Sequence, residues 1–219
     1  RRVMRALVSN DDGIHSAGIE ALERAAKAAG FETYVVAPDR EQSATSHALT
    51  LHRPLRVVRT AERSWVVDGT PTDCVNLAIC KILKDVRPDF VFSGINQGPN
   101  LGDDVTYSGT VAAAFEGTLQ GVPSIAFSLD YRRDQADTPP DFTEAEAMAR
   151  EVIRLALSRP TGDTSPSPFG RVTAAAPSGS APSTPSRPAS CPPPSTPTTP
   201  SGRPTRGRPG LSGSATRRR

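Results

Sequence analysis

Short apolar runs that end in polar residues alternate with segments of helical period along the first two thirds of the chain. This alternation constrains the fold more than any other feature, because strand–helix–strand units build parallel sheets. The expected strands are Arg5–Ser9, Thr33–Ala37, Asp89–Ser93 and Ser124–Leu129. The expected helices are Ala17–Ala29, Val75–Leu83, Val111–Leu119 and Phe142–Leu157. The sequence therefore predicts a three-layer α/β fold around a mostly parallel sheet.

The segments between these elements carry weaker signals. His47–Thr60 alternates between apolar and polar residues, which predicts extended structure in a hairpin with Ser64–Val67. Thr72 or Asp73 is the expected N-cap of the following helix. Gly94–Gly109 is expected to be a long glycine-rich loop.

Three polar clusters follow the expected strands. They are Asn10–Gly13, Asp39–Ser46 and Gly94–Thr110. In an open parallel sheet, ligands bind in the crevice beyond the carboxyl ends of the strands. The shared position of the clusters after strands therefore predicts a single active site at that edge.

The first cluster holds two adjacent carboxylates, Asp11 and Asp12, which repel one another unless a cation or a proton lies between them. Asn96 adds a neutral amide oxygen and Ser43 a hydroxyl, so the four residues suit a hard cation such as Mg²⁺, Mn²⁺ or Ca²⁺. The alternative is a solvated Asp-Asp-Gly turn with an ordinary loop serine and a turn asparagine. The pair Asp103–Asp104 is a second carboxylate pair, for which a solvated or structural role is the simpler interpretation.

The start of the third predicted helix carries Ser108, Gly109 and Thr110, whose hydroxyls and backbone N–H groups would form an anion pocket. The alternative is that Ser108 and Thr110 are simple helix caps. A cation site and an anion pocket at one edge together predict phosphate ester chemistry.

Three further residues are candidates for the catalytic site. Asn10 and Asn100 lie in loops whose backbone is able to approach a ligand closely. His47 is a candidate for orienting substrate or donating a proton, although a histidine beside a strand is more often structural.

Several motifs that define other activities are missing from the sequence. It has no G-x-x-x-x-G-K-[ST], no G-x-G-x-x-G after a strand and no G-x-S-x-G. A P-loop ATPase, a simple dinucleotide-binding domain and a serine hydrolase are therefore disfavoured.

The charge of the chain is divided unevenly. The net charge is +3, but the residues from Pro160 onward hold eight arginines and one acid, Asp163, so residues 1–159 carry −4. This mildly acidic part shows no basic surface for specific nucleic-acid binding.

Three cysteines make neither a disulfide framework nor a zinc motif. No signal peptide and no apolar run of membrane length is evident. These observations predict a cytoplasmic protein without a membrane partner.

Five segments together resemble the SurE survival-protein phosphatases. They are VSNDDGIHSAGI (8–19), VVAPDREQSATSHALT (35–50), DGTPTDCVN (68–76), SGINQGPNLGDDVTYSGTVAAA (93–114) and GVPSIAFSL (121–129). The motifs are long, and they occur in order over roughly residues 3–130.

The resemblance implies a Rossmann-like fold and a nucleotidase that uses one divalent metal ion to release phosphate from 5′- and 3′-nucleoside monophosphates. It also implies activity on polyphosphate in some members. The family's metal ligands fall on Asp11, Asp12, Ser43 and Asn96, and its phosphate-holding motif falls on Ser108, Gly109 and Thr110. The family would also form a homodimer or tetramer through an added C-terminal β element.

The resemblance stops where the composition changes. Residues 1–159 are predicted to be the phosphatase domain, and residues 160–219 a disordered low-complexity tail that holds 14 of the 22 prolines. The tail replaces the C-terminal β element and would reduce activity and remove oligomer contacts. Codons for Thr161–Ser165, moved by one base, are able to encode the Pro-Gly-Thr-Leu expected of the family, which indicates a frameshift.

Two other functions fit the same residues. One is a Rossmann-like nucleotide- or sugar-phosphate-binding protein that transfers a group at this edge. The other is an inactive paralogue whose basic tail binds polyanions.

Overall fold

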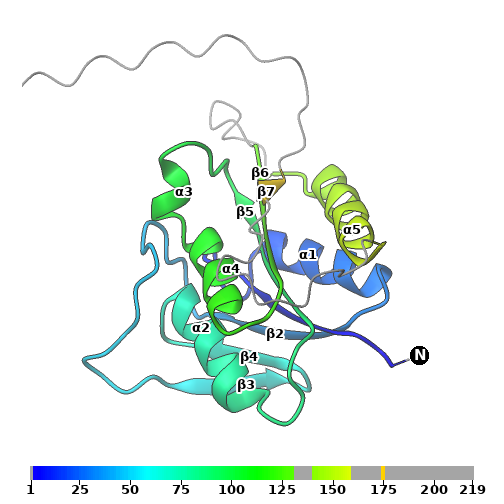
Figure 1. Ribbon diagram of the computed structural model, residues 1–219. Coiled ribbons are helices and arrows are strands. Elements are labelled where there is room, and N and C mark those ends of the chain that lie inside the picture. The colour runs from blue at the N-terminus through cyan, green and yellow to red at the C-terminus, as the bar shows by residue number, and fades with distance from the viewer. Residues whose placement is uncertain (1, 131–139, 159–173, 176–219) are drawn as a thin grey trace, which may run out of the picture. The chain divides into compact units, whose positions relative to one another are not determined.

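The structure is a computed structural model that describes residues 2–130, 140–158 and 174–175 (Figure 1). A seven-stranded sheet has the order β3-β4-β2-β1-β5-β6-β7, and each pair of neighbours is parallel except β3 and β4. The strands are β1 (Arg5–Ser9), β2 (Glu32–Pro38), β3 (Val57–Ala61), β4 (Ser64–Val67), β5 (Phe90–Gln97), β6 (Ser124–Leu129) and β7 (Ala174–Ala175). The predicted mostly parallel α/β sheet is confirmed.

Helices cover both faces of this sheet. They are α1 (Ala17–Ala28), α2 (Pro71–Leu77), α3 (Asp104–Tyr107), α4 (Gly109–Leu119) and α5 (Thr143–Ser158), with a π-helical segment η1 (Ala78–Ile82) after α2. Side chains alternate along β1, so that Ala6 and Val8 pack in one core with α1 and α5, and Leu7 packs in another with α2 and α4. Figure 1 shows α1 and α5 on one side of the sheet and α2 and α4 on the other, which makes three layers.

The connections place a crevice between β1 and β5. The chain leaves β1 through α1 on one face and reaches β2, whereas it leaves β5 through α4 on the opposite face and reaches β6. Because the two connections leave on opposite faces of the sheet, neither covers the carboxyl ends of β1 and β5, and a crevice remains there. The loops after these two strands therefore meet at the place where ligands bind in open α/β sheets.

Local details of four predicted segments differ from the structure. Thr70, not Thr72 or Asp73, is the N-cap of α2; its side chain accepts from the N–H of Asp73, whose carboxylate accepts in turn from the N–H of Thr70. Capping boxes of this kind satisfy two N–H groups at once, so the cap moves toward the N-terminus. Of the predicted extended segment His47–Thr60, only residues from Val57 onward form a strand.

The predicted loop Gly94–Gly109 is shorter in the structure. β5 continues through Gln97, and the short helix α3 occupies Asp104–Tyr107. The predicted helix Val75–Leu83 is divided between α2 and η1.

The predicted tail, residues 160–219, lies outside the described residues except for β7, which pairs in parallel with β6. The sheet lies within Arg1–Ser180, the first of the two units into which the chain divides. Within the described residues, no helix combines the length and the apolar character needed to pass through a lipid bilayer.

Candidate active site

The loop after β1 is largely buried. Asn10 is fully buried and Asp11 is only 5% exposed. The Asn10 amide donates to the backbone carbonyl of Gly13 at 2.9 Å and to the hydroxyl of Ser16, the N-cap of α1, at 2.7 Å. Asn10 therefore fixes the turn that carries the two aspartates to the edge of the sheet.

Asp11 faces the N-terminus of α4. The Thr110 hydroxyl donates to Asp11 Oδ1, and the Thr110 backbone N–H also stabilises this carboxylate. A Cβ added to Gly109 would lie 2.8 Å from Asp11 Cβ and 3.0 Å from its Oδ2, so only glycine allows this approach. The Thr110 N–H at the start of α4 thus meets a carboxylate of the protein itself.

Burial raises the pKa of both aspartates, because it disfavours the charged carboxylate. Desolvation raises the pKa of Asp11 despite the hydrogen bonds from Thr110 that lower it. Desolvation and the neighbouring Asp11 charge raise the pKa of Asp12 to about 6. A pair of carboxylates held in this way is stabilised by a cation beside it.

The loop after β2 supplies an exposed side of the site. Ser43 and Glu41 are exposed, and the Ser43 hydroxyl donates to Glu41 Oε1 at 2.6 Å. The Gln42 N–H donates to the backbone carbonyl of Asp11 at 2.7 Å, which joins this loop to the loop after β1. Ser43 therefore lies beside the carboxylate pair.

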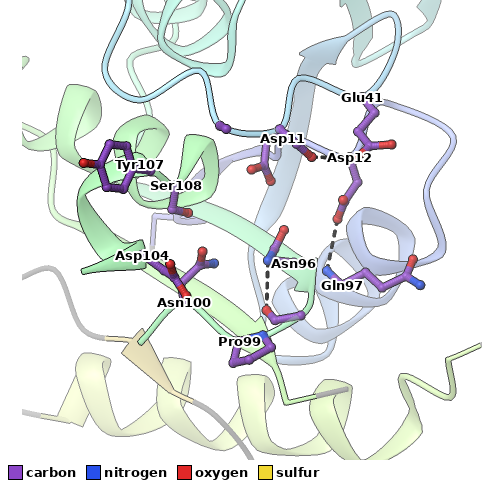
Figure 2. A pocket seen from close by; sticks show the side chains of 13 residues that line it. Asp11, Asp12, Glu41, Asn96, Gln97, Pro99, Asn100, Asp104, Tyr107 and Ser108 are labelled. Atoms are coloured by element: carbon purple, nitrogen blue, oxygen red, sulfur yellow. Dashed lines mark hydrogen bonds between the residues drawn. The ribbon is translucent and has the colours of Figure 1, made fainter. Parts of the chain in front are cut away.

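The end of β5 and the loop that follows it supply amide groups. Asn96 Nδ2 donates to the Gly98 carbonyl at 2.8 Å, and the Gln97 N–H donates to Asp12 Oδ2 at 3.2 Å. Figure 2 shows the carboxamide oxygen of Asn96 turned toward Asp11 and Asp12. The Asn100 amide donates to the buried Ser128 hydroxyl at 2.8 Å, which fixes its side chain against β6.

These loops enclose a cavity of about 570 Å³ (Figure 2). Residues from all three clusters line it, namely Asp11, Asp12, Glu41, Ser43, Ala44, Asn96, Gln97, Gly98, Pro99, Asn100, Asp104, Tyr107 and Ser108. Four of these described lining residues are acidic and none is Lys or Arg. The structure thus brings the four predicted metal ligands, Ser108 and Asn100 to one cavity.

Four predicted site residues are absent from this lining set. Asn10 is buried within the loop after β1, and Gly109 and Thr110 lie against Asp11. His47 is bonded to Glu116 on α4.

Sequence reasoning had not selected Glu41, Gln97 and Tyr107, which also line the cavity, and it had treated Asp104 as one half of a solvated or structural pair. Their only sequence signal is their position within the polar clusters that follow β2 and β5.

Ser108 combines a structural and an exposed polar role. Its oxygen accepts from the Val111 N–H at 3.1 Å, which makes it the N-cap of α4. Its hydroxyl hydrogen is not used in this bond, so it is available to donate toward the cavity.

The donor set fits a hard divalent cation. The described residues hold no group of three or more His, Cys, Asp or Glu placed for a metal, so the cation would be held by two carboxylates and neutral oxygens. Asn96 suits this role because its nitrogen is engaged by Gly98 and its oxygen faces the carboxylates. Few protein ligands and several waters are typical of Mg²⁺.

A family model described as survival protein SurE matches residues 6–176. The chain belongs to the SurE family. The match to the SurE model extends past residue 159, where the predicted domain ends, and includes β7.

Relatives that carry the name 5′-nucleotidase SurE are closely similar in sequence. The protein of Anaeromyxobacter dehalogenans strain 2CP-1 is 56% identical over 157 residues, which cover 72% of this chain and 59% of that protein. The protein of Gemmatimonas aurantiaca is 68% identical over 126 residues, which cover 58% of this chain and 49% of that protein.

The fold agrees with a solved structure of the family. The crystal structure of the SurE protein from Aquifex aeolicus matches with a TM-score of 0.65 and 44% identity over 71% of this chain and 60% of that chain. The chain thus spans about three fifths of the length of the relatives described here, apart from a smaller share of the Gemmatimonas protein.

Proposed function

We propose that this chain is a metal-dependent phosphatase that releases phosphate from nucleoside 5′-monophosphates. The observation that carries the proposal is the cavity itself, which Asp11 and Asp12 line together with Asn96 and Ser43, and no Lys or Arg is among the described lining residues. A phosphate dianion would be repelled by four carboxylates, so its binding requires a cation. The name 5′-nucleotidase SurE, carried by relatives of 56% and 68% identity, supports the same reaction.

The metal would be held by Asp11, Asp12, Ser43 and Asn96. When bound, a divalent ion polarises a phosphoryl oxygen and activates a water molecule for attack. Thr110 orients Asp11 through its hydroxyl, and the Gln97 N–H orients Asp12. Because both carboxylates are fixed by hydrogen bonds, the site would be ordered before the ion binds.

The phosphate would lie between the metal and Ser108. The Ser108 hydroxyl would donate to a phosphate oxygen while its oxygen continues to cap α4. Asn100 would contact the substrate with its carboxamide group, which the bond to Ser128 holds in place and which keeps a second N–H and its oxygen available. Tyr107, which is 61% exposed, and Pro99 give the cavity a less polar rim for the nucleoside.

The same site would accept 3′-monophosphates and polyphosphate. Only the terminal phosphate has to reach the carboxylates, and the nucleoside or the remaining chain would stay at the open rim. We expect Mg²⁺ or Mn²⁺ to support the reaction, with Ca²⁺ as a weaker substitute.

The test is phosphate release from 5′-AMP, 3′-AMP and tripolyphosphate in the presence of Mn²⁺, with and without EDTA. Asp11→Asn should lower the rate by about 1,000-fold or more, because it removes a charge from the metal site. Asp85→Asn, an exposed aspartate outside the cavity, is the matched control and should leave the rate unchanged.

Three results would contradict the proposal. Normal phosphate release by the Asp11→Asn protein would exclude this metal site. Transfer of the phosphoryl group to an acceptor, without free phosphate, would favour a group-transfer enzyme. Salt-sensitive binding of polyanions without any turnover would favour an inactive paralogue.

A further inference from the structure

A buried carboxylate outside the cavity is left unused by the proposed mechanism. Glu116, on the third turn of α4, is only 4% exposed. Asn76 and Gln120 donate to its Oε1, each at 2.9 Å, and His47 Nε2 lies 2.8 Å from its Oε2. A carboxylate is costly to bury unless its oxygens are hydrogen-bonded, so this arrangement indicates a defined role for Glu116.

His47 follows Ser43 by four residues in the segment after β2. Its ring meets Phe115 edge-on, with ring centroids 5.1 Å apart, so His47 contacts two successive residues of α4. The side chain is 34% exposed. His47 is therefore attached to the helix whose N-terminus lies against Asp11.

The loop between Asp39 and His47 has an unfavourable backbone. Ala44 and Ser46 have φ angles of 57° and 50°, in the left-handed region that side-chain-bearing residues rarely adopt. Such residues persist when the surrounding contacts determine their conformation. The contacts that flank Ser43 therefore decide whether it stays at the cavity.

Two backbone hydrogen bonds, together with His47, hold the loop so that Ser43 stays at the cavity. On one side of Ser43, the Gln42 N–H donates to the Asp11 carbonyl at 2.7 Å. On the other side, the Ser46 N–H donates to the Tyr107 carbonyl at 3.1 Å, directly before His47. The far end of the loop is thus held by α3 through the Ser46 backbone and by α4 through the His47 side chain, and the His47 contact is the one of these two that a side-chain substitution removes.

We propose that His47 is a positioning residue, which holds Ser43 at the metal through its bond to Glu116. The proposal rests on the proposed function, because it takes Ser43 as a metal ligand. It replaces substrate contact by His47, since the imidazole is bonded to α4 and is absent from the residues that line the cavity. His47 would thereby link the loop after β2 to the helix that supports Asp11.

The first measurement follows the loop without any metal. Trypsin cleavage after the exposed Arg40 should become several-fold faster in His47→Ala, whereas cleavage after the exposed Arg63 serves as an internal reference. His47→Gln retains a donor and should restore the slow rate. His52→Ala, which removes an exposed histidine of the same segment, is the matched control and should resemble the wild type.

The second measurement is Mn²⁺ affinity without substrate. His47→Ala should weaken binding about three- to tenfold, as expected for the loss of one hydrogen bond. His47→Gln should recover most of this affinity. Because His47 acts through Ser43, the loss in the double variant Ser43→Ala/His47→Ala should equal that of Ser43→Ala alone.

Each result decides the proposal. Unchanged cleavage at Arg40 in His47→Ala, or additive losses of Mn²⁺ affinity in the double variant, would overturn it. A raised KM for 5′-AMP with unchanged Mn²⁺ affinity would show substrate contact instead. A further outcome is faster cleavage at Arg40 in His47→Ala while the wild type neither binds Mn²⁺ nor releases phosphate. That outcome would support the contact between His47 and Glu116, but it would overturn both the role of His47 at the metal and the proposed function.

Discussion

The loop after β1 and the loop after β2 supply the same cavity in different ways. Asn10 and Asp11 are buried, and hydrogen bonds from Asn10 and Thr110 fix the first loop. Ser43 and Ala44 are exposed, and the second loop is held by contacts on either side of them. The comparison teaches that Asp11 is ordered by burial, which raises its pKa, whereas Ser43 is ordered by a few hydrogen bonds on either side of it.

Among variants that keep all four proposed metal ligands, the largest effect is expected where the buried loop after β1 is displaced. Gly109→Ala would place a Cβ 2.8 Å from Asp11 Cβ and 3.1 Å from Pro71 Cγ, and it should lower phosphate release about 100-fold by displacing Asp11. Gly117→Ala is the control in the same helix, because its Cβ would meet Ser124 Oγ at 2.5 Å and Val91 Cγ2 at 2.7 Å, away from Asp11.

Both glycine variants should lose about 1–3 kcal/mol of unfolding free energy by overpacking. Only Gly109→Ala should also lose Mn²⁺ affinity. Equal loss of activity in the two variants at a temperature where both are folded would refute the direct contact with Asp11.

The next effect concerns pH in metal-free protein. Because the folded pKa of Asp12 is raised to about 6, the folded state binds the proton more tightly than the unfolded state. The unfolding free energy should therefore rise as the pH falls from 8 through 6, and this gain should level off near the unfolded pKa of about 4. The full shift corresponds to at most about 3 kcal/mol, and partial exposure of Asp12 reduces it.

Asp12→Asn should reduce this dependence, since the amide does not titrate, and the slope that remains should come from Asp11, whose pKa burial also raises. The measurement is the thermal midpoint between pH 8 and pH 5 in EDTA, for the wild type, Asp12→Asn and the exposed control Asp85→Asn. A wild-type slope in Asp12→Asn would mean that another group causes the dependence.

A smaller effect compares serines of the two regions. Ser108→Ala removes the cap of α4 and should cost about 0.5–2 kcal/mol of unfolding free energy. Ser43→Ala removes only a bond to exposed Glu41 and should cost less than about 0.5 kcal/mol. Denaturant unfolding measures both, and equal costs would contradict the difference between the loops.

The smallest expected effect is a change in unfolding free energy when backbone strain in the exposed loop after β2 is removed. Ala44→Gly should raise the unfolding free energy by up to about 1 kcal/mol, because glycine tolerates the positive φ without strain. Ala147→Gly, at an exposed position inside α5, is the control and should lower it by about 1 kcal/mol. If the two variants are destabilised equally, the conformation of Ala44 is not strained.

The sequence predicted the members of the site better than their surroundings. Asp11, Asp12, Ser43 and Asn96 were selected for their chemistry and for their place after strands, and all four line the cavity. The sequence places Asp11 in a polar cluster after a strand, whereas the structure buries it. The pattern of apolar and polar residues shows where β1 ends, but it does not show that α4, about 100 residues later in the sequence, packs against the loop at that end.

What the sequence by itself determined is the order of the elements and the edge at which their polar residues gather. Both follow from local periodicity and turn chemistry, which act over a few residues. The tertiary structure alone decided that the Thr110 hydroxyl donates to Asp11 and that His47 is bonded to Glu116. The members of these pairs are 99 and 69 residues apart in the sequence. These contacts depend on how closely α4 packs against the sheet, and that distance is set by Gly109 and Gly117 only once the layers have come together.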